Sequence, residues 1–137
     1  MVFDRKLLPA TADALAPDGS AVRILLELRG GSMAHFALAP GQCSVAVRHR
    51  TVEEIWFFLG GRGELWRSTG AHREVVEVGA GVCITLPLGT DFQFRSFGPE
   101  ELTAVAVTMP PWPGDGEAIR VEGEWTPTTP PGSGLAS

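Results

Sequence analysis

The chain has 137 residues, 44% of them hydrophobic and 20% charged, which suits one globular domain with a single core. Its formal net charge of −5 argues against a nucleic acid or an anionic membrane as a partner, and no apolar stretch approaches the roughly 20 residues that span a bilayer. Because the N-terminus also lacks the continuous apolar run of a secretory signal, we expect a cytoplasmic protein. Cys43 and Cys83 lie among small and apolar residues, so we expect two buried free thiols.

Short strands separated by glycine and proline turns follow an N-terminal arm at residues 1–20. The strands are expected at residues 22–29, 34–38, 44–50, 54–59, 64–67, 73–78, 82–86, 92–97 and 102–109. This rhythm, with almost no helical period, indicates an all-β sandwich or barrel at 21–109. The proline-rich segment 110–137 cannot enter a sheet interior and is expected to wrap the surface, with Trp112 and Trp125 as anchors. Its end, PTTPPGSGLAS, is a candidate for disorder.

Two stretches of the strand-rich region carry regularly spaced residues. In the first, Gly41 is followed by five residues, then by Val47, Arg48, His49, four residues, Glu54, six residues and Gly61. In the second, Gly81 is followed by five residues, then by Pro87, Leu88, Gly89, two residues, Phe92, three residues and Ser96. These spacings resemble the two motifs of the cupin family, G-x5-H-x-H-x3–4-E-x6-G and G-x5-P-x-G-x2-H-x3-N. The resemblance implies a cupin double-stranded β-helix, or jelly-roll barrel.

The family's metal centre, three histidines and one glutamate, is incomplete in this sequence. His49 and Glu54 stand at two ligand positions, whereas Val47 and Phe92 replace the other two histidines. Two protein donors bind a divalent ion weakly, so the cofactor is either none or a weakly bound divalent transition metal held by His49 and Glu54. Candidates for a further ligand are His35, Cys43, Asp91 and Gln93.

A metal-free pocket is the alternative, with His49 and Glu54 as a catalytic pair. Alternation along the strands gives a ligand-binding wall of Val47, Trp56, Phe58, Phe92 and Phe94, and turns Glu53 outward. A carboxylate in an apolar wall tends to a raised pKa, so such a pair could perform acid–base work near neutral pH. The chemistry that this allows is proton transfer of the isomerase, epimerase, dehydratase or cyclase type.

Three functions therefore stay open. The first is a small-molecule-binding cupin that performs proton transfer without a tightly bound metal. The second is a metal-dependent, dioxygenase-like cupin enzyme with an incomplete ligand set, and the third is a non-catalytic ligand-binding module. The expected partner is a small organic ligand, aromatic or polyketide-like rather than a sugar. Because many small cupins are dimers, we also expect a homodimer, in which the N-terminal arm and Ile24–Leu25 add a strand to a second copy.

Overall fold

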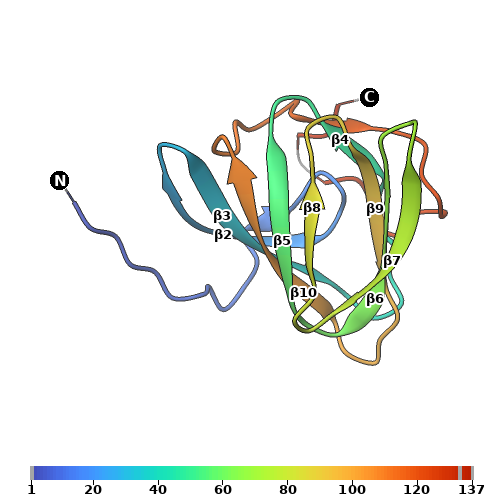
Figure 1. The fold of residues 1–137 in the computed structure, drawn as a ribbon. Helices are drawn as coiled ribbons and strands as arrows, with labels where there is room; N and C mark the ends of the chain where they lie inside the picture. The colour runs from blue at the N-terminus through green and yellow to red at the C-terminus, as the bar shows by residue number, and fades with distance from the viewer. Residues whose placement is uncertain (1, 133, 137) are drawn as a thin grey trace.

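The computed structural model describes residues 2–132 and 134–136, which form two antiparallel β-sheets packed face to face (Figure 1). The six-stranded sheet contains, in spatial order, β1 (Ala14–Leu15), β2 (Ala21–Leu28), β3 (Gly31–Leu38), β10 (Leu102–Met109), β5 (Glu53–Gly60) and β8 (Cys83–Leu86). The five-stranded sheet contains β11 (Ala118–Arg120), β4 (Val47–His49), β9 (Asp91–Ser96), β6 (Arg62–Ser68) and β7 (Arg73–Gly79). In the part of the chain described, no helix has the length and hydropathy of a membrane span.

All nine predicted strands are present, and the all-β prediction is confirmed. β1 and β11 were not predicted: they have two and three residues and lie outside the strand-rich region 21–109, in segments without a strand period. In β5 the side chains alternate strictly between the interior and solvent, with Glu54, Trp56 and Phe58 inside and Glu53 exposed. The motif spacing therefore identified the correct carboxylate of the Glu53–Glu54 pair as the interior one.

The hydrophobic core lies between the two sheets and is built from inward-facing residues of both. Its largest fully buried side chains include Trp56, Phe58 and Phe94. The corners of the barrel depend on glycine at Gly61, the last position of the first motif. This residue has φ +78°, and a Cβ atom there would lie 2.3 Å from the carbonyl oxygen of Glu101. The motif glycine is thus required by the fold rather than by the chemistry of a site.

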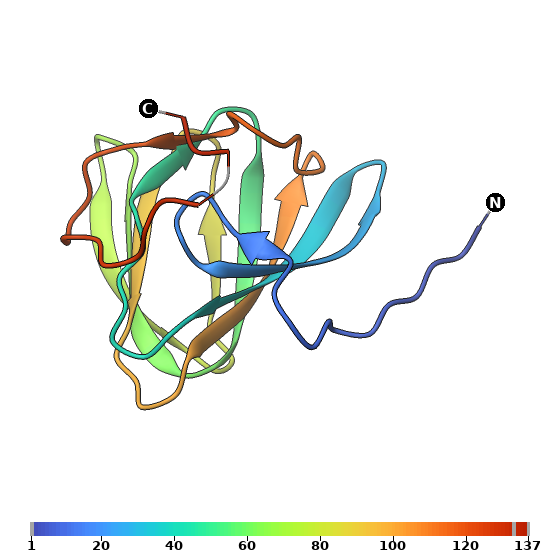
Figure 2. The same cartoon turned by 180° about the vertical axis from the view of Figure 1, so that it is seen from behind.

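The C-terminal segment runs along the five-stranded sheet, and the N-terminal arm extends away from the barrel (Figure 2). Gln93, which is fully buried, joins the C-terminal segment to the barrel. Its Nε2 donates to the carbonyl oxygens of Ser44 and Trp125, both at 2.8 Å, and its Oε1 accepts from the backbone N–H of Trp125 at 2.9 Å. Disorder is predicted for the chain end, residues 127–137. Of these, residues 133 and 137 lie outside the described residues.

The prediction of two buried thiols is wrong for Cys83. Cys43 is buried, but Cys83 is exposed, and both are free cysteines. In β8 the alternation places Ile84 and Leu86 in the core, so Cys83 faces outward from the six-stranded sheet. The surrounding small and apolar residues gave no indication of this, because alternation decides the exposure of a strand residue.

Candidate functional site

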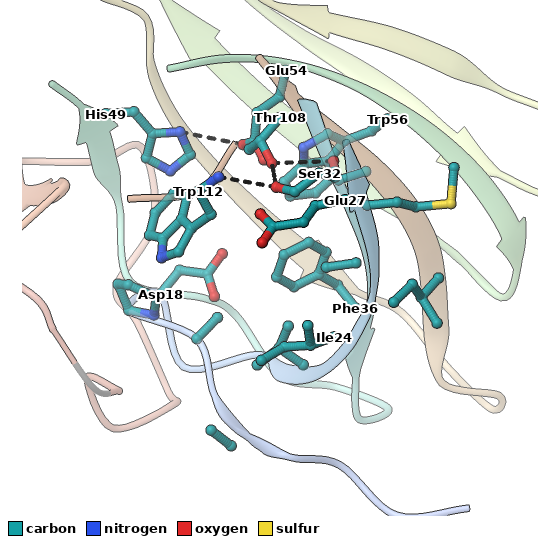
Figure 3. Close-up of a pocket in the computed structure, with 18 of the residues that line it drawn as sticks. Asp18, Ile24, Glu27, Ser32, Phe36, His49, Glu54, Trp56, Thr108 and Trp112 are labelled. Atoms are coloured by element: carbon teal, nitrogen blue, oxygen red, sulfur yellow. Dashed lines mark hydrogen bonds and ion pairs between the residues drawn. The ribbon is translucent and has the colours of Figure 1, made fainter. Parts of the chain in front are cut away.

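A cavity of about 450 Å³ lies between the two sheets, and the β2–β3 hairpin of the six-stranded sheet forms part of its wall (Figure 3). Five residues of the predicted site line it: Val47, His49, Glu54, Trp56 and Phe92. They come from β4, β5 and β9, three strands that the sequence separates but the jelly roll brings together. Val47 and Phe92 are direct partners in the β4–β9 pair. The structure thus places the residues of both motifs around one cavity.

Phe58 and Phe94, also predicted for the ligand-binding wall, do not line this cavity. They are 0% and 1% exposed, and both pack against Trp56, with ring centroids 6.0 and 5.1 Å away. Alternation gives the face of a strand on which a side chain lies, but it does not give the depth along the barrel axis. These two rings lie in the core, where they hold the Trp56 ring that forms part of the cavity wall.

His49 and Glu54 form the polar centre of the cavity. Their nearest atoms, Nδ1 and Oε1, are 3.3 Å apart, and their side chains are only 10% and 3% exposed. Oε1 nevertheless has no hydrogen-bond partner within the described residues. A buried carboxyl oxygen that faces a cavity without a partner is available to a ligand.

Burial sets the protonation of this pair. It raises the pKa of Glu54 to about 8, opposed by the nearby Trp56 side chain and reinforced by the charges of Asp18 and Glu117. Burial lowers the pKa of His49 to about 4, and Glu117 offsets only part of that change. At neutral pH the carboxyl therefore carries a proton and the imidazole is neutral, so the pair is a neutral acid beside a neutral base.

Aromatic rings enclose the imidazole of His49. Phe92 and Trp112 approach it edge-on, with centroid distances of 5.2 and 5.0 Å. The Trp112 backbone is fixed over the cavity, because its N–H donates to Ser32 Oγ at 3.0 Å, and Ser32 Oγ lies 2.5 Å from Thr108 Oγ1. The proline-rich segment after β10 thus excludes water from the imidazole and causes the low pKa described above.

Glu117 lies behind His49, next to the β4–β5 connection. Its Oε2 accepts the backbone N–H of Thr51 at 2.7 Å and that of Val52 at 3.3 Å, and the Thr51 hydroxyl donates to Oε1. Burial acts to raise the pKa of Glu117, but these hydrogen bonds outweigh it and hold that pKa below its usual value. Glu117 is therefore ionised at neutral pH and supplies a fixed negative charge near His49.

Several residues that line the cavity were not predicted from the sequence, notably Asp18, Phe36, Thr108 and Trp112. Alternation along β10 places Thr108 on the same face as the buried Ala106, so a signal existed for it. Asp18 and Trp112 lie in segments between strands, where no periodicity predicts the direction of a side chain. Their position follows only from the folded path of the chain.

None of the candidate further ligands joins His49 and Glu54. Asp91 forms an ion pair with Arg48 on the outside, at 2.6 Å, and Gln93 is occupied by the C-terminal segment. His35 and Cys43 are not among the cavity-lining residues. Within residues 2–132 and 134–136, no group of three or more His, Cys, Asp or Glu could hold a metal ion. The donor set therefore does not fit the family's four-ligand metal centre, because the apolar side chains of Val47 and Phe92 occupy the two other ligand positions.

Comparison with known proteins supports the fold. No protein-family model and no curated protein matches the chain. Among solved structures, a double-stranded β-helix protein from Klebsiella pneumoniae is 22% identical, with a TM-score of 0.58 over 66% of this chain and 72% of that one. A protein from Bacillus halodurans is 20% identical, with a TM-score of 0.62 over 72% of this chain and 73% of that one.

Two named proteins resemble the chain over part of their length. The capsular polysaccharide assembling protein CapF from Staphylococcus aureus is 14% identical, with a TM-score of 0.65 over 80% of this chain and 34% of that one. Oxalate decarboxylase from Bacillus subtilis is 15% identical, with a TM-score of 0.64 over 73% of this chain and 28% of that one. The chain thus spans about a third of each. Together with the two sheets, these likenesses establish an all-β cupin fold, some of whose neighbours are enzymes.

Proposed function

We propose that this chain binds a small organic molecule in the barrel cavity and transfers protons to and from it through His49 and Glu54. The observation that carries the proposal is a buried carboxyl 3.3 Å from a buried imidazole, both facing a cavity of about 450 Å³, where burial raises the pKa of Glu54 and lowers that of His49. An acid and a base whose environments separate their protonation states are the usual requirement for proton transfer near neutral pH.

The two groups support each other during the reaction. Glu54 donates its proton to an oxygen of the ligand, such as a carbonyl, while His49 accepts a proton from the neighbouring carbon. As Glu54 loses its proton, its new negative charge raises the proton affinity of His49, which lies beside it. The ionised Glu117 behind the imidazole acts in the same direction and is a positioning residue.

Return of the proton to a different atom or face completes an isomerisation or epimerisation. In a dehydration, the protonated His49 gives its proton to a hydroxyl on the next carbon, which leaves as water while the enol O–H proton returns to Glu54. In a cyclisation, the enol carbon forms a bond to a second carbonyl carbon of the same ligand, whose oxygen takes the proton from His49 while the enol O–H proton returns to Glu54.

Deuterium exchange tests this proposal without knowledge of the natural substrate. Ketones that carry an aromatic ring, such as 1-tetralone and 4-phenyl-2-butanone, are incubated with the protein in D2O. Loss of the α-hydrogen signal is followed by NMR. We expect the protein to accelerate exchange, and we expect His49→Ala and Glu54→Gln each to remove about 10²-fold or more of that acceleration. Glu53→Gln is the matched control, because Glu53 is adjacent in sequence but exposed.

Two outcomes would contradict the catalytic part of the proposal. One is exchange that proceeds equally in the wild type and in both variants, with circular dichroism showing that all are folded. The other is quenching of tryptophan fluorescence by a ketone with no acceleration of exchange, which would leave a ligand-binding module.

A further inference from the structure

The cavity contains an unusual set of charged residues. Four of its lining residues are acidic: Asp18, Glu27, Glu54 and Asp115. No Lys or Arg lines it within the described residues, although the chain has 11 of them. Figure 3 shows the side chains of Asp18, Glu27 and Glu54 around the same space as the ring of Trp112. A ligand in this cavity therefore meets carboxyl groups and no fixed positive charge.

Two of these carboxyl groups are buried in the wall of the cavity. Asp18 is 5% exposed and Glu54 is 4% exposed. Ser20 donates both of its hydrogen bonds, from N–H at 2.9 Å and from the hydroxyl at 2.7 Å, to the same Asp18 oxygen, Oδ1. Glu54 Oε1 has no partner in the part of the chain described. Buried polar oxygens are normally satisfied, so an unpartnered one facing a cavity points to a donor on the ligand.

Aromatic rings supply the rest of the wall. Phe36 and Trp56 stack with centroids 5.6 Å apart and an interplanar angle of 10°, and Phe92 and Trp112 add two further rings. The face of an aromatic ring attracts a cation, and tryptophan does so most strongly. An anion in the same place would lose its hydration and gain no opposite charge, which costs a large free energy.

We propose that the ligand of this cavity is a small organic cation: an amine whose ammonium group lies between Asp18, Glu54 and Trp112, with an apolar or aromatic body against Phe36 and Trp56. This inference rests on the proposed function only in taking the cavity as the ligand site. It holds whether or not His49 and Glu54 catalyse a reaction. Carboxylates, phosphates and nucleotides are disfavoured, because no Lys or Arg among the described residues lines the cavity to compensate their charge.

Three probes with one aromatic body test the charge preference: 3-phenylpropylamine, 3-phenylpropanol and 3-phenylpropionate. Their dissociation constants are measured by isothermal titration calorimetry at pH 7.5, with quenching of tryptophan fluorescence as a second readout. We expect the amine to bind at least tenfold more tightly than the alcohol and the carboxylate to show no binding. In Glu54→Gln and Asp18→Asn the affinity for the amine should fall at least fivefold, while the affinity for the alcohol changes less than twofold. Glu53→Gln should change neither.

The pH dependence of amine binding provides an independent test. The titratable groups that face the ammonium position are Asp18, Glu27, Glu54, His49 and Asp115, with Glu117 behind the imidazole. Binding of a cation favours ionised carboxyl groups, so amine affinity should rise between pH 6 and pH 8 and binding should release protons, as seen in buffers of different ionisation enthalpy.

The outcomes separate this inference from the proposed function. Equal affinity for all three probes, or preference for the carboxylate, would overturn the inference and leave the cavity as a ligand site. Absence of binding by every probe at millimolar concentration would count against both.

Discussion

In the part of the chain that the structure describes, Glu54 has no charged partner that compensates its ionisation. The basic group beside it, His49, is held neutral by Phe92, Trp112 and burial. A carboxyl group in such a place keeps its proton, because ionisation would leave an uncompensated buried charge. The same burial that makes Glu54 useful as an acid near neutral pH therefore makes the fold sensitive to alkaline pH.

This sensitivity predicts the dependence of stability on pH. The pKa of Glu54 in the folded state, about 8, exceeds its ordinary value of 4.5. The contribution of Glu54 to the free energy of unfolding is therefore complete below pH 4.5 and is lost as pH rises toward 8. The pKa of His49, about 4, lies below 6.5, so its contribution is present above 6.5 and is lost as pH falls toward 4. The two dependences oppose each other from pH 4.5 to 6.5, and only that of Glu54 acts from 6.5 to 8.

We expect the free energy of unfolding, measured by urea titration, to fall by about 1.4 kcal/mol per pH unit at most between pH 6.5 and 8. Glu54→Gln should reduce this slope by the share that Glu54 contributes, leaving any share from Asp18, whose pKa is also raised by burial, and leaving the loss of stability below pH 6 that His49 causes. A variant whose stability falls between pH 6.5 and 8 as steeply as that of the wild type would show that Glu54 is already ionised in the folded protein.

The two missing metal ligands can each be restored by one substitution. Val47 and Phe92 are direct strand partners and line the cavity with His49 and Glu54. We expect Val47→His/Phe92→His to complete a set of three histidines and one glutamate that binds about one Ni²⁺ or Zn²⁺ per chain, measured by mass spectrometry of the metal content after dialysis. The wild type and each single variant should bind less tightly by at least tenfold. Stoichiometric metal in the wild type would mean that a further donor exists.

At the scale of the strand, alternation predicted faces correctly but not positions along the barrel. It placed Glu54 and Trp56 in the interior and Glu53 outside, and the turn residues located nine of the eleven strands of the described residues. It could not separate Trp56, in the cavity wall, from Phe58, in the core, because both share one face of β5. Trp112 and Asp18, which cover the cavity, lie in irregular segments whose paths are set by tertiary hydrogen bonds. No periodic pattern in the sequence predicts the direction of side chains in such segments.

The connection of the C-terminal segment to the barrel depends on Gln93. Replacing Gln93 by Ala removes four hydrogen bonds, one of them to Cys43 Sγ at 3.4 Å, and leaves the N–H and carbonyl groups of Trp125 without that partner. We expect a loss of about 2–3 kcal/mol in the free energy of unfolding, because buried polar groups that lose a partner cost about 1–3 kcal/mol. Gln42→Ala is the matched control: its side chain accepts one exposed hydrogen bond, and the change should stay within about 0.5 kcal/mol. Equal losses in the two variants would show that the segment is held by other contacts.

For the whole molecule, the outer face of β5 and the N-terminal arm expose apolar side chains outside the cavity. The outer face of β5 exposes Ile55, Phe57 and Leu59 at 42%, 44% and 46%. The N-terminal arm, which extends away from the barrel in Figure 1, also carries Val2 and Phe3. Their exposed fractions are 84% and 90%. Its direction is nevertheless fixed by contacts of residues 6–13 with β2, such as Arg23 Nε to the Pro9 carbonyl oxygen at 2.8 Å. An anchored arm that buries none of these side chains on its own barrel favours contact with a second copy.

We therefore expect a homodimer in which the arm of each chain covers the β5 face of its partner. Size-exclusion chromatography with light scattering at micromolar concentration should give twice the chain mass of 14.6 kDa. Deletion of residues 2–8 should give the monomer mass, because it removes the apolar arm but leaves the Pro9 contact with Arg23. Phe57→Asp should do the same, since it places a charge in the proposed interface. Leu88→Asp is the control, as Leu88 is a similarly exposed residue, at 55%, outside β5. A monomeric wild type would contradict the expected homodimer. A dimer that persists in both variants would show that the interface lies elsewhere.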